Sequence, residues 1–252
     1  MLLATGRVPN VKGLGLELAS VDYSESDGIY ANDFLETTNP QVYALGDCLA
    51  LANNKALAEK MPGSGPQFTH NSDVQARAVV KNAFSQQKVN VKSELLPWTT
   101  YTDPELSHVG KYPHELRKLG IEFDTWSKFY ERLDRAHCEG KQGMLKILTK
   151  KGTDEILGAS AVGGPAGELI MTLATGMRNG QGLSAIGAGV YPYPSWSEGI
   201  KHLADQYNRS VKEKPKEMTI VQHLNSLVDY VPDPKKVSES KQADSGEKKQ
   251  EN

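Results

Sequence analysis

The 252-residue sequence predicts an α/β segment followed by an α+β unit with an antiparallel sheet. Near the N-terminus, short β-favouring runs stop at Gly6 and Gly46, as strands do before a loop. Further along, the β-favouring runs 143–149 and 155–162 are joined by a polar turn over 150–154, which predicts a hairpin. Apolar residues at helical spacing flank this hairpin, so the chain is expected to hold helices as well as strands.

The first part is expected to begin with the end of a buried strand at 2–4. Short strands over 28–30 and 41–45 should follow, and then a loop over 50–68. A helix is predicted after Thr69, because apolar residues recur there at helical spacing. Its buried stripe is predicted to consist of Ala76, Val79, Val80, Ala83 and Phe84.

The second part is predicted to open with a strand over 98–102 after Pro97. A short helix over 112–119 and a strand over 121–130 should then precede the hairpin. Two amphipathic helices are expected after the hairpin. Their buried residues are predicted to be Ala166, Leu169, Ile170, Leu173, Ala174 and Met177 in the first, and Trp196, Ile200, Leu203, Ala204 and Tyr207 in the second, which should span 195–209.

The composition argues against several classes of partner. A formal net charge of −2 gives no reason to expect nucleic acid, and no apolar run approaches the roughly 20 residues of a membrane span. Cys48 and Cys138 form no CxxC pattern, which predicts a reducing intracellular compartment, either the cytoplasm or an organelle. His137 and Cys138 are expected on a strand, with side chains on opposite faces, so no metal site is predicted. Residues 213–252 are polar and predicted to be mostly disordered.

Gly46 and Asp47 are candidate ligand-binding residues. A glycine lets a ligand approach the backbone closely, and an ionised aspartate accepts hydrogen bonds from hydroxyl groups. This pair suits a polyol or ribose chain at the end of a strand, where open α/β sheets bind ligands. Taken alone, the dipeptide is more often an ordinary turn at the end of a strand.

Several motifs in order resemble the flavoprotein pyridine nucleotide-disulfide oxidoreductases, which include dihydrolipoamide dehydrogenase, glutathione reductase and mercuric reductase. The motifs are ATGRVPN at 4–10, NPQVYALGDC at 39–48 and FTHNSDVQARAVVKNAF at 68–84. The stretch PWTTYTDPELSHVG at 97–110 is similar to the C-terminal interface domain of that family. The resemblance implies FAD and NAD(P)H as cofactors.

The resemblance also implies a domain organisation. Residues 1–7 would end an NAD(P)-binding domain, 8–96 would form the C-terminal segment of a Rossmann-like FAD-binding domain, and 97–212 would form the dimerisation domain of a homodimer. The sequence contains no GxGxxG turn and no CxxxxC pair, which such an enzyme needs for its nucleotides and its redox disulfide. We therefore expect the chain to act as a C-terminal half, together with upstream segments or a separate N-terminal half.

The resemblance implies a flavin site in the first part. Gly46 and Asp47 would contact the ribityl chain of FAD. Phe68, Thr69 and His70 would bring the N-terminus of the following helix towards the flavin ring. A helix N-terminus carries partial positive charge, which suits the negative charge that reduced flavin concentrates at its pyrimidine edge.

Tyr193 and Glu198 are candidate catalytic residues on the same resemblance. Family disulfide reductases carry a histidine at the position of Tyr193, oriented by a glutamate at the position of Glu198, and the pair reaches the flavin of the other subunit. A tyrosine with an ordinary pKa near 10 is a poor base at neutral pH, but it can donate a hydrogen bond. Ser195 and Glu198 also match a capping box, which gives Glu198 a structural alternative.

Three functions stay open at the level of the sequence. The first is the C-terminal half of a flavin-dependent NAD(P)H oxidoreductase that passes hydride through FAD to a disulfide or another acceptor. The second is a non-catalytic dimerisation module, so whether this chain alone is an enzyme is left open. The third is a mercuric reductase-like protein, which Tyr193 and the DRA motif at 134–136 favour. The C-terminal vicinal cysteine pair of mercuric reductase does not occur in the sequence.

Overall fold

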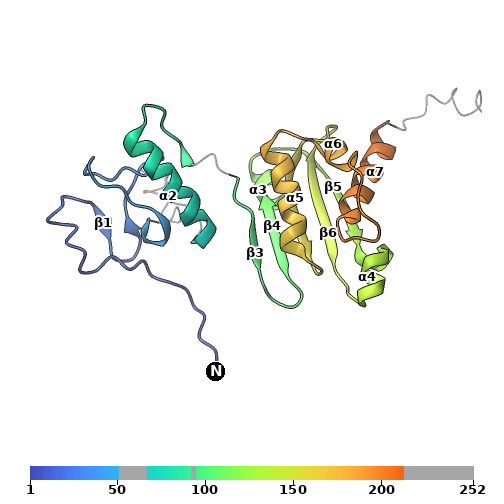
Figure 1. The fold of residues 1–252 in the computed structure, drawn as a ribbon, viewed down its shortest axis with the longest axis horizontal. Helices are drawn as coiled ribbons and strands as arrows, with labels where there is room; N and C mark the ends of the chain where they lie inside the picture. Colours follow the sequence, from blue (N-terminus) through green and yellow to red (C-terminus); the bar gives the residue numbers. More distant parts are fainter. Residues whose placement is uncertain (51–66, 92–94, 213–252) are drawn as a thin grey trace, which may run out of the picture.

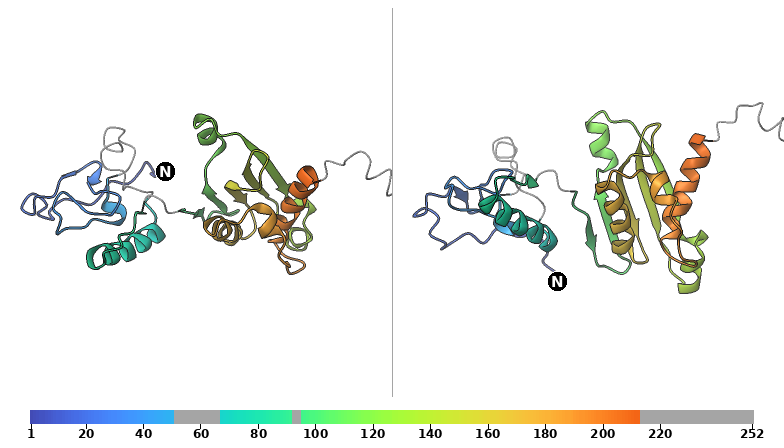
Figure 2. Two further views of the ribbon diagram at one scale, coloured as in Figure 1. Left: turned by 90° about the horizontal axis from the view of Figure 1, so that it is seen from above. Right: turned by 45° about the horizontal axis from the view of Figure 1, so that its top comes forward.

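The computed structural model describes residues 1–50, 67–91 and 95–212. Within these residues the chain forms an N-terminal unit (residues 1–91) and a C-terminal unit (residues 95–212), which lie next to each other (Figure 1). Two further views also show the two units as separate bodies that lie next to each other (Figure 2). Each unit has its own cluster of buried hydrophobic residues. The predicted mixed α/β fold with an antiparallel sheet is confirmed.

The N-terminal unit consists mainly of loops around a small core. Among its described residues, the regular elements include the antiparallel pair β1 (Tyr23–Ser24) and β2 (Gly28–Ile29), the 3-10 turn η1 (Gly46–Cys48) and the helix α2 (Thr69–Phe84). Loop residues supply most of the core side chains, and the sheet of this unit has two strands among the described residues. The core includes Val11, Leu16, Val21, Ile29, Ala31, Leu35, Ala44, Leu49 and Ala78.

Two predicted strands of the N-terminal unit are wrong. Residues 2–4 have no regular structure and are exposed, because no strand among the described residues lies beside them to pair with their backbone. The run 41–45 forms a single isolated bridge, between Glu36 and Tyr43, instead of a strand. The loop predicted over 50–68 falls mostly outside the described residues.

Helix α2 begins at Thr69 as predicted, and Val79 packs partly buried against the core, but most of the predicted buried stripe is wrong. Phe84 is 88% exposed and Val80 is also exposed, whereas the polar Gln75 and Asn82 are buried beside Ala78. The side-chain amide of Asn82 donates to the carbonyls of Phe34 and Val89 at 2.9 and 3.0 Å. The buried amide provides hydrogen bonds for these two loop carbonyls, which an apolar side chain cannot do.

The C-terminal unit is built on one five-stranded antiparallel sheet of order β3-β4-β7-β6-β5. The strands predicted over 121–130, 143–149 and 155–162 are confirmed, and so is the hairpin turn between the last two. The strand β4 was not predicted, because its residues do not alternate clearly. The strands are β3 (Trp98–Thr100), β4 (Leu106–Gly110), β5 (Phe123–Phe129), β6 (Met144–Lys150) and β7 (Ile156–Val162).

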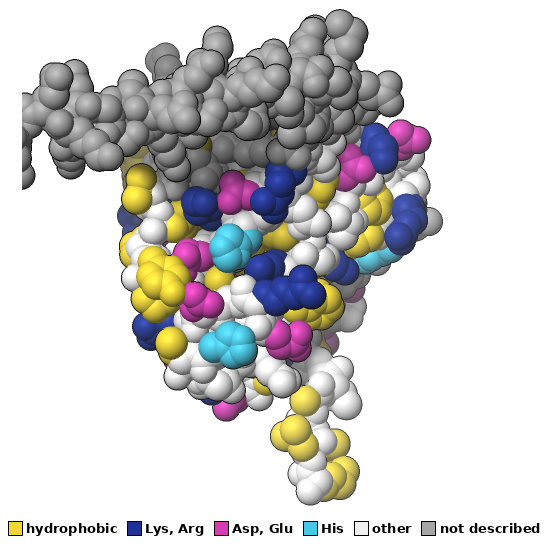
Figure 3. All heavy atoms as spheres, turned by 90° about the vertical axis from the view of Figure 1, so that its right-hand side faces the viewer, with side chains coloured by type: hydrophobic (Ala, Val, Ile, Leu, Met, Phe, Trp, Pro, Cys, Tyr) yellow, Lys and Arg dark blue, Asp and Glu magenta, His cyan; other side chains and the backbone are white. Residues whose placement is uncertain are grey.

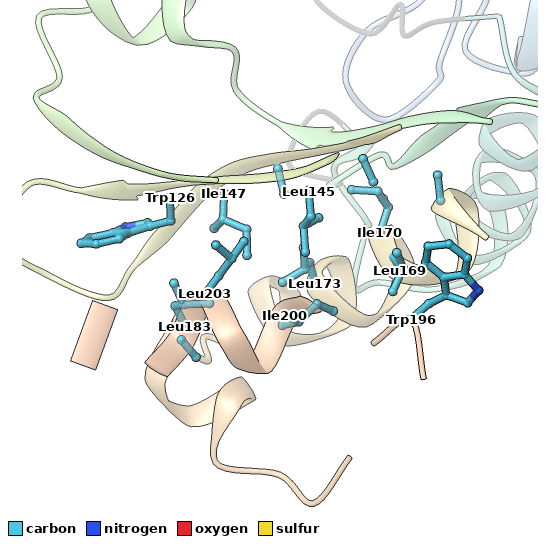
Figure 4. Packing of buried hydrophobic residues seen from close by; sticks show 14 of the residues in the cluster. Trp126, Leu145, Ile147, Leu169, Ile170, Leu173, Leu183, Trp196, Ile200 and Leu203 are labelled. Atoms are coloured by element: carbon cyan, nitrogen blue, oxygen red, sulfur yellow. The ribbon is translucent and has the colours of Figure 1, made fainter. Parts of the chain in front are cut away.

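Helices α5 (Ala166–Arg178) and α7 (Glu198–Lys212) cover one face of this sheet (Figure 1). Figure 4 shows Leu145 and Ile147 pointing from the sheet towards Leu173 and Leu203 of the two helices. The predicted buried residues of both helices belong to one core cluster, in which Met177 is partly buried. This burial confirms the two amphipathic helices. Helix α7 starts at Glu198, three positions later than the predicted start.

Three short helices complete the C-terminal unit: α3 (Pro113–Lys118), α4 (Asp134–Glu139) and α6 (Leu183–Gly187). The expected strand at His137 and Cys138 is wrong, since both residues lie on α4. This helix is held by the fully buried Leu133 before it, and it ends at Gly140 in the left-handed conformation (φ +62°). The 3-10 turn η3 (Tyr130–Arg132) leads into α4.

On the face shown in Figure 3, basic and acidic side chains are interspersed instead of grouped by sign. Among the residues that the structure describes, no helix combines the length and apolar character needed to cross a membrane.

Candidate functional site

Arg7, Asp47 and Gln67 form a hydrogen-bonded cluster in the N-terminal unit. The Arg7 guanidinium donates to a carboxylate oxygen of Asp47 at 2.9 Å and to the carbonyl of Gln67 at 2.6 Å. The side-chain amide of Gln67 donates to the Asp47 carbonyl at 3.3 Å. Asp47 stays 48% exposed, so its carboxylate can still accept hydrogen bonds from a ligand.

Gly46 lies directly against helix α2. Its backbone has φ +73°, and a Cβ atom there would lie only 2.9 Å from the Ser72 hydroxyl oxygen. Its N–H donates to the side-chain oxygen of the buried Gln75 at 2.6 Å. These contacts place the Gly46–Asp47 dipeptide beside the first two turns of α2, in a setting that only glycine fits without strain.

The N-terminus of α2 begins at Thr69, after Phe68 in an extended conformation. The first backbone hydrogen bond of this turn runs from the Ser72 N–H to the Phe68 carbonyl. Helix geometry leaves the N–H groups of Thr69 and His70 without an intrahelical acceptor, and the helix dipole adds partial positive charge there. The phenylalanine and histidine rings stack with centroids 5.1 Å apart. This end of the helix suits an electron-rich planar ligand.

The His70 ring contacts the C-terminal unit. Its Nε2 lies 2.9 Å from the carbonyl oxygen of Pro97, which can only accept, so Nε2 carries the proton. The His70 side chain therefore links the start of α2 to the C-terminal unit.

A cavity of about 670 Å³ opens between α2 and α5. Its apolar wall includes Phe68, Val74, Trp98, Ile170 and Met171, and its polar lining includes Thr69, Glu168 and Arg178. The cavity therefore connects the N-terminus of α2 with the C-terminal unit, while Asp47 lies outside its lining.

Tyr193 is 72% exposed, and its hydroxyl group donates to a carboxylate oxygen of Asp134 at 2.6 Å. This hydrogen bond and the negative charge of Asp134 raise the pKa of Tyr193 above its ordinary value. The family pattern predicts Glu198 as the orienting residue, but the structure brings Tyr193 to Asp134 instead.

Glu198 forms one half of the predicted capping box. Its carboxylate accepts a hydrogen bond from the Ser195 backbone N–H at 2.9 Å. The Ser195 hydroxyl lies 3.0 Å from the Ser197 hydroxyl, so it is directed to this side chain. Glu198 thus stabilises the entry to α7, which is the structural alternative considered from the sequence.

Cys48 does not have the surroundings of a redox-active thiol. The half-buried Cys48 donates to the Leu45 carbonyl at 3.1 Å, and burial raises the pKa of its thiol. Cys138 is exposed on α4. A raised pKa disfavours the reactive thiolate, so Cys48 is best explained as a packing residue.

Sequence reasoning did not assign roles to Arg7, Gln75 and Asp134. Arg7 lies within the ATGRVPN motif and Asp134 within the DRA motif, so the motifs contained a signal for both. Gln75 had no such signal, because a polar residue on a helix is ordinarily solvent-exposed.

Comparison with protein families gives two matches. Residues 96–204 match the dimerisation domain of pyridine nucleotide-disulphide oxidoreductases, and residues 1–76 match the family described as pyridine nucleotide-disulphide oxidoreductase. The two matches follow the order of the two units in the structure.

Curated relatives include a mercuric reductase of Acidithiobacillus ferrooxidans, 30% identical over 216 residues, and a dihydrolipoyl dehydrogenase of Thermus scotoductus, 33% identical over 210 residues. These alignments cover 84% and 83% of this chain, but only 36% and 42% of the relatives. The chain therefore spans roughly two fifths of the length of the curated relatives that it matches.

Among solved structures, the Cu(II) complex of the HOCl-induced flavoprotein disulfide reductase RclA from Escherichia coli superimposes with a TM-score of 0.70. That alignment covers 81% of this chain and 43% of RclA, at 24% identity, so the likeness concerns the fold. The two family matches, their order along the chain and the relatives point to one conclusion. The chain belongs to the family of FAD- and NAD(P)-dependent pyridine nucleotide-disulfide oxidoreductases.

Proposed function

We propose that this chain is the C-terminal part of a flavin-dependent NAD(P)H oxidoreductase that passes hydride through FAD to a disulfide or another acceptor. Its N-terminal unit supplies a flavin contact, and its C-terminal unit supplies the interface of a homodimer. The observation that carries this proposal is the position of Gly46 and Asp47 beside the N-terminus of α2.

The residues at this place fit a flavin. The Asp47 carboxylate is accessible and accepts hydrogen bonds, as the hydroxyl groups of a ribityl chain require. Gly46 leaves the backbone open to close approach. The N–H groups of Thr69 and His70 suit the electron-rich edge of the isoalloxazine ring. When bound, FAD supplies the redox chemistry by taking hydride from a nicotinamide.

The match of the C-terminal unit to a dimerisation domain supports a role for this unit in the dimer interface. We propose that residues 97–212 form the interface between two copies and that Tyr193 reaches the flavin of the other copy. As a phenol, Tyr193 serves as a hydrogen-bonding group, and Glu198 serves mainly to hold the loop before α7. The nucleotide-binding segments of the enzyme would come from upstream residues or from a separate N-terminal half.

The test uses the protein purified from its own cells through an affinity tag at the C-terminus of the native gene. Absorbance and fluorescence after heat release report the FAD content, and sedimentation equilibrium reports the oligomeric state. NADH- and NADPH-dependent reduction of a dye reports turnover. We expect one FAD per copy, a dimer and dye reduction.

A matched pair of variants tests the site itself. Asp47→Ala should lower the FAD content at least about tenfold, the equivalent of one charge-assisted hydrogen bond. Asp73→Ala removes another exposed aspartate that pairs with an arginine, Arg77 at 3.0 Å, and should retain FAD. A dimer without flavin or dye reduction would overturn the proposal and favour the non-catalytic dimerisation module. Equal FAD content in both variants would remove the role of Asp47.

A further inference from the structure

Helix α4 and the segment before α7 are linked at two points. At the start of α4, Asp134 accepts the hydrogen bond from Tyr193 at 2.6 Å, across 59 positions of sequence. At the end of α4, a carboxylate oxygen of Glu139 lies 3.4 Å from the indole N–H of Trp196 and also pairs with Arg135. The two links join the same short helix to the same loop.

The two residues that anchor these links, Trp196 and Leu133, are buried in the core. Trp196 is buried and meets the ring of the fully buried Tyr130 edge-on, with centroids 5.2 Å apart. The backbone N–H of Leu133, which is also fully buried, donates to the Tyr130 carbonyl at 2.9 Å. Asp134 therefore projects from a fixed position.

Tyr193 itself has little packing to hold it. Its side chain is largely exposed, in contrast to Tyr191, whose hydroxyl donates to the Ile186 carbonyl at 3.0 Å. Glu198 is engaged by the Ser195 backbone. Among the hydrogen bonds of the described residues, the bond to Asp134 is the one that defines where the Tyr193 hydroxyl lies.

We infer that Asp134 is the positioning residue of Tyr193, because its carboxylate holds the hydroxyl as a donor and fixes the orientation of the exposed ring. Tyr193 is thereby kept as a neutral phenol on an exposed side chain. The hydrogen bond between Tyr193 and Asp134 does not depend on a flavin. The contact of the fixed phenol with the flavin of the other copy, however, rests on the proposed function. In this chain the orienting carboxylate comes from α4, whereas the family pattern takes it from the start of α7.

The electrostatic surroundings of Tyr193 agree with this role. Asp134 and Cys138 of α4 and Glu198 of α7 are the titratable groups that face the phenol. All three disfavour a phenolate, and the hydrogen bond to Asp134 is the largest cause of the raised pKa. Removal of the Asp134 charge should therefore lower the pKa of Tyr193 more than removal of the Glu198 charge.

The experiment is NMR on the full chain, labelled with ¹³C at Cζ of its ten tyrosines. The signal of Tyr193 is assigned by its loss in Tyr193→Phe. Titration compares the wild type with Asp134→Asn and with the matched control Glu198→Gln. We expect the wild-type midpoint to lie above about 10, the value of an unperturbed tyrosine. Asp134→Asn should move it down, with a smaller shift in Glu198→Gln.

A second measurement is made at pH 7, so that unfolding at alkaline pH cannot affect its result. Relaxation of the ring ¹³C nuclei should show that the Tyr193 ring becomes more mobile in Asp134→Asn, while the Tyr191 ring stays unchanged. An unchanged midpoint and an unchanged ring mobility in Asp134→Asn would overturn the inference, and so would an equal effect of Glu198→Gln. Neither readout needs FAD, so a chain that shows the coupling but binds no flavin would refute only the proposed function.

Discussion

The guanidinium of Arg7 lies 2.9 Å from the carboxylate of Asp47, although forty positions separate the two residues. Arg7 also donates to the Gln67 carbonyl, so it joins the N-terminal segment, the Gly46–Asp47 turn and the approach to α2. Exposed ion pairs contribute little to stability. We therefore expect this contact to affect the orientation of Asp47 more than the stability of the protein.

Replacement of Arg7 by methionine should separate orientation from stability. We expect the free energy of unfolding to change by less than about 1 kcal/mol, because the pair is exposed. The FAD content of the natively purified protein should nevertheless fall severalfold. Lys12→Met, which breaks the exposed pair with Glu25, is the control and should retain FAD. Full flavin retention in the Arg7 variant would contradict the orienting role.

The buried Gln75 should contribute measurably to the stability of the N-terminal unit. In Gln75→Met the Gly46 N–H loses its acceptor, which should cost about 1–3 kcal/mol. Urea unfolding followed by circular dichroism measures this change. Gln86→Met, at an exposed position of the loop after α2, should stay within about 0.5 kcal/mol of the wild type. Equal stability of the two variants would show that the buried amide is dispensable.

Helix α5 offers a matched test of the C-terminal core. Leu173 is fully buried against the sheet, so Leu173→Ala should destabilise the C-terminal unit by about 2–5 kcal/mol. Met171 on the same helix is 49% exposed, and Met171→Ala should cost less than about 1 kcal/mol. Differential scanning calorimetry would measure the loss of stability in each of the two variants. A small effect at Leu173 would mean that this face of α5 is not packed as described.

The stability of the C-terminal unit should depend on pH through His108. Burial lowers the pKa of His108, whose Nε2 donates to the Gly110 carbonyl and whose Nδ1 accepts from the Ser160 hydroxyl. The His108 ring therefore binds a proton more readily in the unfolded state than in the folded state. The contribution to stability should be complete above about pH 6.5 and should decline as the pH falls below it.

Urea unfolding between pH 5 and 8 tests this dependence. His108→Gln should flatten the decline, and the exposed His114→Gln should leave it unchanged. Some slope should remain in His108→Gln, because the pKa of His202 is also lowered by burial. The same slope in the wild type and in His108→Gln would refute the role of this residue.

Local pattern was enough to predict much of the C-terminal unit. The β6–β7 hairpin follows from two β-favouring runs around a polar turn, and α5 and α7 follow from apolar residues at helical spacing. These features depend on neighbours in sequence, which a linear pattern contains. The order of the motifs likewise led to the family, and two family matches confirm it.

The tertiary structure decided which side of α2 is buried and which carboxylate holds Tyr193. Most of the predicted apolar stripe of α2 was wrong because the buried Gln75 and Asn82 form hydrogen bonds with backbone groups of the loops. Asp134 replaced Glu198 beside Tyr193 because η3 and α4 return the chain to the loop before α7. Hydrogen bonds across 29 to 59 positions depend on how the units fold back on themselves, and periodicity along the sequence carries no information about that path.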